Sequence, residues 1–173
     1  MLPCPAMSHP AAPAFSILMV CTGNICRSPT ADGVLRHMLR AAGLETMVLV
    51  DSAGTHDYHI GDPPDPRSVA TAKGYGVDLS TLRARQVVLE DFTRFDLILA
   101  MDEGHYAQLL RLCPPAYRDR VKLYLAYAPE LGRIVPDPYY GGADGFETVW
   151  RMCQAVSAAL VAEIRTRLQV KTP

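Results

Sequence analysis

A cysteine and an arginine stand six positions apart in the segment ILMVCTGNICRSP. A cysteine thiolate, here that of Cys21, is a nucleophile that can form a covalent intermediate, and the guanidinium of Arg27 is a planar fork that matches two phosphate oxygens. Between them lie Thr22, Gly23, Asn24, Ile25 and Cys26. This spacing predicts a short loop that binds an anion, with transfer of a phosphoryl group to sulfur as its chemistry.

The residues in and after this loop suit an anion-binding turn. Gly23 can adopt a positive φ without steric penalty, and Asn24 tolerates one better than most residues. Ser28 and Pro29 open a predicted helix, whose N-terminus contributes a partial positive charge. The groups that hold a phosphate also stabilise a thiolate, so we expect Cys21 to be ionised at neutral pH and Ser28 to donate a hydrogen bond to it.

A second group of candidate residues lies in the turn-rich segment 129–145. Asp137 stands between two prolines, which restrict its backbone and could direct its carboxyl group. Beside a bound phosphate this group can protonate the leaving oxygen of a phosphomonoester, so we expect Asp137 to be the general acid. Tyr139 and Tyr140 could form one aromatic wall of the substrate pocket, and Tyr58 the other.

Alternating strands and helices are expected to position these residues. Short apolar runs predict strands at 15–21, 46–51, 95–102 and 121–126. Apolar residues at three- and four-residue steps predict helices at about 28–42, 66–73, 103–112 and 146–168. The alternation predicts a single three-layer α/β domain over residues 15–170, with an open parallel sheet of about four strands and helices on both faces. The phosphate-binding loop follows the first strand, at the edge where such sheets bind ligands.

Charge and composition limit the possible partners. The 173 residues include 17 Lys and Arg against 18 Asp and Glu, which gives no support for nucleic-acid binding. No apolar run approaches the length of a transmembrane helix, so we expect no membrane insertion. Five scattered cysteines fit neither a disulfide framework nor a zinc site, and they indicate a cytoplasmic protein. The proline-rich residues 1–14 lack the pattern of a signal peptide and are expected to form a disordered extension.

The loop and the late acidic motif resemble those of the low-molecular-weight protein tyrosine phosphatases. That family has a Cys-x5-Arg-Ser loop with Gly-Asn inside it and a second cysteine before the arginine, which matches residues 21–28. Its Asp-Pro-Tyr-Tyr element matches residues 137–140, and weaker similarity extends to the segments SAGT, DPR, ARQV, DLILAMD and FETVW. The resemblance covers residues 15–168, nearly the whole chain.

The resemblance implies hydrolysis of phosphotyrosine in proteins through a phosphocysteine on Cys21, with release of inorganic phosphate and without metal or cofactor. Arg27 would bind the phosphate, and Asp137 would act first as general acid and then as general base. The implied substrate-binding residues are Thr22, Gly23, Asn24, Ile25, Cys26, Ser28, Tyr58, Tyr139 and Tyr140. Because Cys26 shares the loop with Cys21, we also expect it to capture oxidised Cys21 as a reversible disulfide.

Two departures from the family pattern and two alternative functions remain. Asp32 stands where the family usually has Glu and His105 where many members have Asn, and both are expected outside the reacting centre. An arsenate reductase on the same fold usually needs a close pair of further cysteines, but none occurs between Cys26 and Cys113. A non-catalytic phosphate-binding module would be expected to lack the nucleophile or the acid, and both are present.

Overall fold

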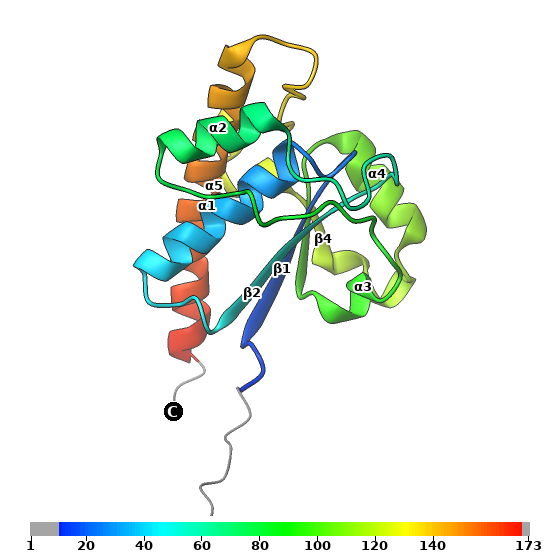
Figure 1. Ribbon diagram of the computed structural model, residues 1–173. Helices are drawn as coiled ribbons and strands as arrows, with labels where there is room; N and C mark the ends of the chain where they lie inside the picture. Colours follow the sequence, from blue (N-terminus) through cyan, green and yellow to red (C-terminus); the bar gives the residue numbers. More distant parts are fainter. Residues whose placement is uncertain (1–10, 171–173) are drawn as a thin grey trace, which may run out of the picture.

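Four parallel strands form the centre of the molecule in the computed structural model, which describes residues 11–170 (Figure 1). The strands are β1 (Phe15–Cys21), β2 (Val48–Gly54), β3 (Leu97–Ala100) and β4 (Val121–Leu123). The α-helices are α1 (Arg27–Ala41), α2 (Pro66–Gly74), α3 (Asp91–Arg94), α4 (Glu103–Leu112) and α5 (Ala143–Val170). Short 3-10 helices span Pro115–Arg120, Tyr124–Tyr127 and Pro129–Leu131. Of the extension predicted at 1–14, residues 1–10 lie outside the described part of the chain.

The strand order β2-β1-β3-β4 places β1 inside the sheet. Its register pairs Cys21 with Gly54 on one side and Val20 with Ala100 on the other. Because these strands are parallel, their carboxyl ends meet at one edge, and the loop after β1 lies between the segments that follow β2 and β3. The predicted α/β fold with a four-stranded parallel sheet is confirmed.

Two hydrophobic cores lie on opposite faces of the sheet, because successive side chains of a strand point to opposite sides. Ile17 and Met19 pack in the core that includes residues of α1 and α5. Leu18 and Val20 pack in the other core, with residues of α3 and α4. Figure 1 shows the same layers, with α2 lying beside α5. Burial on both faces explains why β1 is apolar at almost every position.

Several elements differ from the sequence expectations, and β3 is shorter than expected, at Leu97–Ala100. β2 spans Val48–Gly54, so it begins later and ends later than predicted. The polar side chains of Asp51 and Ser52 concealed the end of the strand in the sequence. The apolar segment 121–126 is a strand for three residues only, and a 3-10 helix then places Tyr124 in the core. The four-residue helix α3 was not predicted, because so short a segment has no measurable periodicity.

Gly33, in the interior of α1, allows this helix to pack closely on the segment after α2. Alanine is normally the better residue within a helix. A Cβ atom at Gly33 would lie 2.2 Å from Cδ2 of Leu79, however, and Leu79 is fully buried. The glycine is therefore required by packing and not by its backbone conformation.

We expect Gly33→Ala to destabilise the protein by about 1–3 kcal/mol, the usual range for overpacking a core. Gly74→Ala is the matched control, because a Cβ atom there meets nothing within 4 Å. It should be neutral or stabilising, as expected when a helical glycine becomes alanine. Urea denaturation of both variants measures the difference, and a Gly33→Ala variant as stable as the parent would show that Leu79 can move aside.

Candidate active site

The loop between β1 and α1 turns at Asn24, which has a φ of 59°. Among the residues that the structure describes, it is the only non-glycine residue with a positive φ. The expectation that Gly23 takes this conformation was wrong, since its φ is not positive. A Cβ atom at Gly23 would lie 2.8 Å from Cδ2 of His59, so a side chain there would displace the His59 ring.

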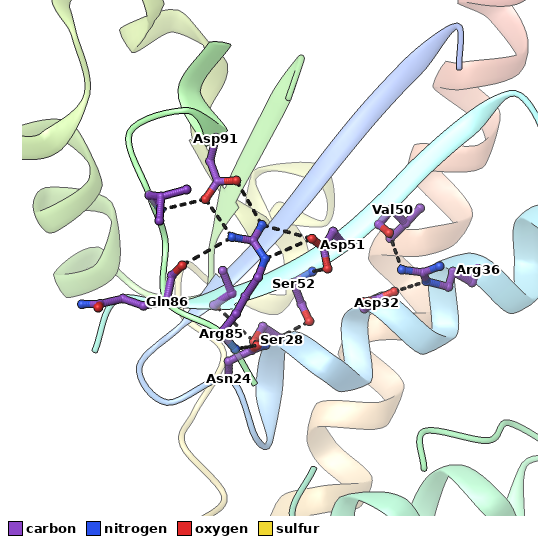
Figure 2. A network of polar contacts seen from close by, with 12 residues as sticks. Asn24, Ser28, Asp32, Arg36, Val50, Asp51, Ser52, Arg85, Gln86 and Asp91 are labelled. Carbon is purple, nitrogen blue, oxygen red and sulfur yellow. Dashed lines mark hydrogen bonds and ion pairs between the residues drawn. The ribbon is translucent and has the colours of Figure 1, made fainter. Parts of the chain in front are cut away.

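Hydrogen bonds connect the side chain of Asn24 to the predicted nucleophile. Nδ2 of Asn24 donates to Oγ of Ser28 at 2.8 Å and to Oγ of Ser52 at 2.9 Å (Figure 2). Oγ of Ser28 lies 2.9 Å from Sγ of Cys21. The polar side chains of Asn24, Ser28 and Ser52 are buried, and so is Cys21. Ser28 is thus placed to donate its hydrogen to the sulfur of Cys21.

The guanidinium of Arg27, the first residue of α1, is buried and held in a fixed orientation. Nη1 donates to Oδ2 of Asp102 at 3.0 Å and to the carbonyl oxygen of Val135 at 3.1 Å. Nη2 lies 3.4 Å from Oγ1 of Thr22. Burial acts to raise the pKa of Asp102, but the backbone N–H of His105 and the charges of His105 and Arg27 outweigh it and hold this pKa below its ordinary value. Asp102 is therefore a permanent anion beside Arg27 at neutral pH.

Asp137 lies at the mouth of the same site. Its Oδ2 is 3.6 Å from Nη2 of Arg27, and its side chain is 41% exposed. Oδ1 accepts a hydrogen bond from the backbone N–H of Tyr139 at 3.1 Å, which bends the chain after Pro138. The predicted acid and the predicted phosphate-binding arginine are therefore neighbours.

Arg67, near the start of α2, connects the loop of Asp137 to the loop of Cys21. It donates to Asp65 from Nε and Nη2 at 3.0 and 2.8 Å, and to the carbonyl oxygen of Tyr139 from Nη1 at 3.2 Å. Its guanidinium also lies over the rings of Tyr139 and Phe146. The backbone N–H of Asp65 donates to the carbonyl oxygen of Ile25 at 2.8 Å. Asp65 and Arg67, at the start of α2, therefore connect the two loops by hydrogen bonds.

A cavity of about 230 Å³ lies between these loops. Its lining residues are Cys21, Thr22, Gly23, Ile25, Cys26, Arg27, Tyr58, His59, Asp137, Tyr139 and Tyr140. Every predicted site residue lines this cavity except Asn24 and Ser28, whose side chains are buried. Tyr58 and Tyr140 are largely exposed at its rim.

Cys26 differs from Cys21 in its surroundings. Burial, and then the negative charge of Asp65, raise the pKa of the Cys26 thiol to about 12. Cys26 therefore remains protonated at neutral pH. The disulfide between Cys21 and Cys26 stays a prediction.

The family model described as low molecular weight phosphotyrosine protein phosphatase matches residues 16–170. The chain belongs to this family. The low molecular weight protein-tyrosine-phosphatase of Streptomyces coelicolor is 44% identical over 162 residues, which cover 90% of this chain and 96% of that protein. The human low molecular weight phosphotyrosine protein phosphatase is 42% identical over 140 residues, covering 80% of this chain and 88% of the human protein.

Solved structures agree with this assignment. The crystal structure of a protein tyrosine phosphatase from Entamoeba histolytica, with Hepes in the active site, superposes with a TM-score of 0.85 at 35% identity. The match covers 88% of this chain and 97% of that one. The resemblance inferred from the two motifs is confirmed, and the chain is a protein tyrosine phosphatase of the low-molecular-weight family.

Three residues in or beside this phosphatase site were not among the predicted site residues. His59 lines the cavity next to Tyr58, and its place beside a predicted site residue was the available signal. Asp102 was predicted as the last residue of the third strand, but β3 ends at Ala100, and the carboxylate of Asp102 reaches Arg27. His105 was expected outside the reacting centre, but its Nε2 lies 2.7 Å from Oγ1 of Thr22. The helical turn from Asp102 to His105 carries both residues to the loop.

Residues 11–170 offer neither a metal site nor a membrane-spanning helix. That range holds no group of three or more His, Cys, Asp or Glu side chains arranged to bind a metal ion. It also holds no helix long and apolar enough to cross a membrane.

His105 makes the stability of this phosphatase depend on pH. Burial lowers its pKa to about 4, Arg27 acts in the same direction, and Asp102 acts against it. In the unfolded chain a histidine binds its proton near pH 6.5. Between these values the unfolded state binds more protons than the folded state, so stability is lost as the pH falls from about 6.5 to about 4.

We expect His105→Asn to remove this part of the pH dependence. At about 1.4 kcal/mol per pKa unit, the parent should lose up to about 3 kcal/mol more than the variant over this range. Urea denaturation at several pH values measures the difference, and His37→Asn, which changes an exposed histidine of α1, is the control. Parallel stability curves for the parent and His105→Asn would contradict the prediction.

Proposed function

We propose that this phosphatase hydrolyses phosphotyrosine in proteins through a phosphocysteine on Cys21, with Asp137 as general acid and then general base. The observation that carries the proposal is the arrangement around Cys21. Ser28 lies 2.9 Å from its sulfur, and Arg27 and Asp137 line the same cavity. A nucleophile, a phosphate-binding cation and a proton donor thus face one space.

In the first step the Cys21 thiolate attacks phosphorus, and the bond from phosphorus to the phenolic oxygen breaks. The electron pair of that bond goes to the oxygen, which takes a proton from Asp137 as tyrosine leaves. Arg27 binds two of the phosphoryl oxygens and neutralises their charge. The carboxyl oxygen of Asp137 lies 3.6 Å from Arg27, so a phosphate held there has the acid beside it.

In the second step water attacks the phosphorus of phosphocysteine and gives its proton to the Asp137 carboxylate. The bond from phosphorus to sulfur breaks, inorganic phosphate is released, and the electron pair returns to sulfur as the thiolate. Ser28 stabilises this leaving group through its hydrogen bond. Asp137 is again protonated, and the cycle needs no further reactant.

The aromatic and apolar side chains that line the cavity suit a flat aromatic substrate. Tyr58 comes from the loop after β2, whereas Tyr139 and Tyr140 come from the loop before α5. Ile25 adds an apolar surface without a hydroxyl group. A short phosphoserine side chain would have to bring its own backbone into the cavity, so we expect tyrosine-phosphorylated proteins to be the substrates.

We propose the cytoplasm as the compartment. Cys21, Cys26, Cys113 and Cys153 are all free cysteines in the structure. A reducing compartment keeps such thiols reduced, which the nucleophile requires.

Cys21→Ser should abolish turnover while leaving binding of inorganic phosphate partly intact, because the loop and Arg27 remain. Rapid acid quenching with labelled nitrophenyl phosphate should give a phosphorylated protein with the parent and none with the variant. Cys113→Ser, in the core below α4, is the control and should retain turnover. If the parent binds phosphate without turnover, the result would instead favour a non-catalytic phosphate-binding module. If the parent reduces arsenate, the result would favour an arsenate reductase.

Asp137→Asn should slow the cleavage of phosphotyrosine more than that of nitrophenyl phosphate. A phenol with a pKa near 10 leaves poorly without a proton, whereas an acidic nitrophenol leaves well. General acid catalysis contributes about 10²–10⁴-fold, so single-turnover rates should separate the two esters clearly.

Asp144→Asn is the matched control for this experiment, since Asp144 is an exposed carboxylate of α5 outside the cavity. It should leave both rates unchanged. Equal slowing of the two esters by Asp137→Asn would assign the acid to another residue.

A further inference from the structure

The hydrogen-bond chain that ends at Cys21 has a direction. A serine hydroxyl carries one hydrogen, and that of Ser28 can reach Sγ of Cys21 at 2.9 Å or the carbonyl oxygen of Ala53 at 3.4 Å. Because Asn24 donates to Ser28 from Nδ2, the hydrogen of Ser28 remains available for Cys21. With the Asn24 amide turned over, its oxygen would face Ser28 and accept that hydrogen instead.

The backbone N–H of Arg85 determines which way the Asn24 amide points. It donates to Oδ1 of Asn24 at 3.0 Å (Figure 2). A backbone N–H can only donate, so the amide oxygen has to face Arg85 and the NH₂ group has to face Ser28 and Ser52. The same contact supports Asn24 in its left-handed conformation.

The side chain of Arg85 forms hydrogen bonds with two other elements, and these hold the backbone N–H of Arg85 in place. Nε donates to Oδ2 of Asp51 in β2 at 3.1 Å. Nη1 and Nη2 donate to the two carboxylate oxygens of Asp91, at the start of α3, at 2.9 and 3.1 Å. Figure 2 shows the guanidinium lying between the two carboxylates.

Both carboxylates are themselves held by backbone groups. Asp91 is 2% exposed, and its Oδ2 also accepts the N–H of Val88 at 2.9 Å. Oδ1 of Asp51 accepts the N–H of Ser52 at 2.8 Å. Charge-assisted bonds to fixed, partly buried partners are stronger and more directional than a surface ion pair. The guanidinium of Arg85 is thus anchored to fixed points on two elements.

We propose that Arg85 is a positioning residue for the nucleophile. Its contacts with Asp51 and Asp91 hold the N–H that orients Asn24, and Asn24 directs the hydrogen of Ser28 onto the sulfur of Cys21. Loss of these contacts loosens the segment around Arg85 and removes part of the stabilisation of the thiolate. The inference rests on the proposed role of Cys21 but not on the substrate that is cleaved.

The test is the rate of Cys21 alkylation by iodoacetamide as a function of pH, with the modified residue identified by peptide mapping. In Arg85→Met the midpoint of this profile should move upward by about one pH unit, a tenfold smaller ratio of thiolate to thiol. Arg27 and Asp137, the charged side chains that line the cavity with Cys21, are unchanged in this variant. Arg85→Lys keeps one charge and should give a midpoint between those of the parent and Arg85→Met.

Arg120→Met is the matched control. Nη1 of Arg120 donates to the carbonyl oxygens of Phe92, Thr93 and Phe95, so this arginine fastens α3 at its other end. The variant should lose stability and keep the parental midpoint. An equal shift in Arg120→Met and Arg85→Met would reduce the role of Arg85 to general stability and overturn the proposal.

A double-mutant cycle tests whether Arg85 acts through Asn24. Asn24→Ala should raise the midpoint, and adding Arg85→Met should not raise it further. Additive shifts, or a parental midpoint in Arg85→Met, would overturn the proposal. If Arg85→Met does not fold, Asp51→Asn removes one of the two carboxylate partners and should shift the midpoint in the same direction. Failure of the proposed function would appear separately, as an absence of phosphotyrosine turnover in the parent, because alkylation requires no turnover.

Discussion

Arg27 carries a positive charge that is only 4% exposed, and a buried charge must be paired and hydrogen-bonded to be tolerated. Asp102, after β3, supplies the counter-charge, and the carbonyl oxygen of Val135 accepts a second hydrogen bond. The hydrogen bonds of this one guanidinium therefore bring three segments together. These are the start of α1, the residues after β3 and the segment that leads from Val135 to Asp137. The candidate acid Asp137 lies beside the candidate phosphate-binding arginine because two residues earlier the chain is hydrogen-bonded to that arginine.

The buried carboxyl group of Asp32, in α1, also has an arginine partner. Asp32 is fully buried, and burial raises the pKa of its carboxyl group despite the opposing contacts with Arg36. Arg36 lies one helical turn later, donates to Asp32 and also donates to the carbonyl oxygen of Val50 (Figure 2). This pair ties α1 to β2. The departure from the family's usual Glu is therefore accommodated by a neighbour on the same helix.

The parts of the site that could be predicted from the sequence are those whose reactive residues lie close together in the chain. Cys21, Arg27 and Ser28 lie in the single short segment 21–28, so their residue types and spacing sufficed to place them together after the first strand. Asp102 and Arg85 could not be assigned in this way, because their roles depend on strand register and on which atoms of distant segments meet. The conformation of the loop was also beyond the sequence pattern, because Gly23 and Asn24 both suit a positive φ and only the structure shows that Asn24 adopts it.

The hydrogen bonds that complete the site join residues far apart in the chain. Asn24 and Arg85 are separated by 61 positions, Arg27 and Asp102 by 75, and Arg27 and Val135 by 108. Contacts of such long range require large loops to close first, and loop closure is opposed by chain entropy. The loop of Cys21 consequently has no local folding unit of its own in which it could form. The geometry of this loop therefore depends on the folding of the whole sheet, and a fragment that ends before Val135 lacks the surroundings of Arg27 however well its first strands pair.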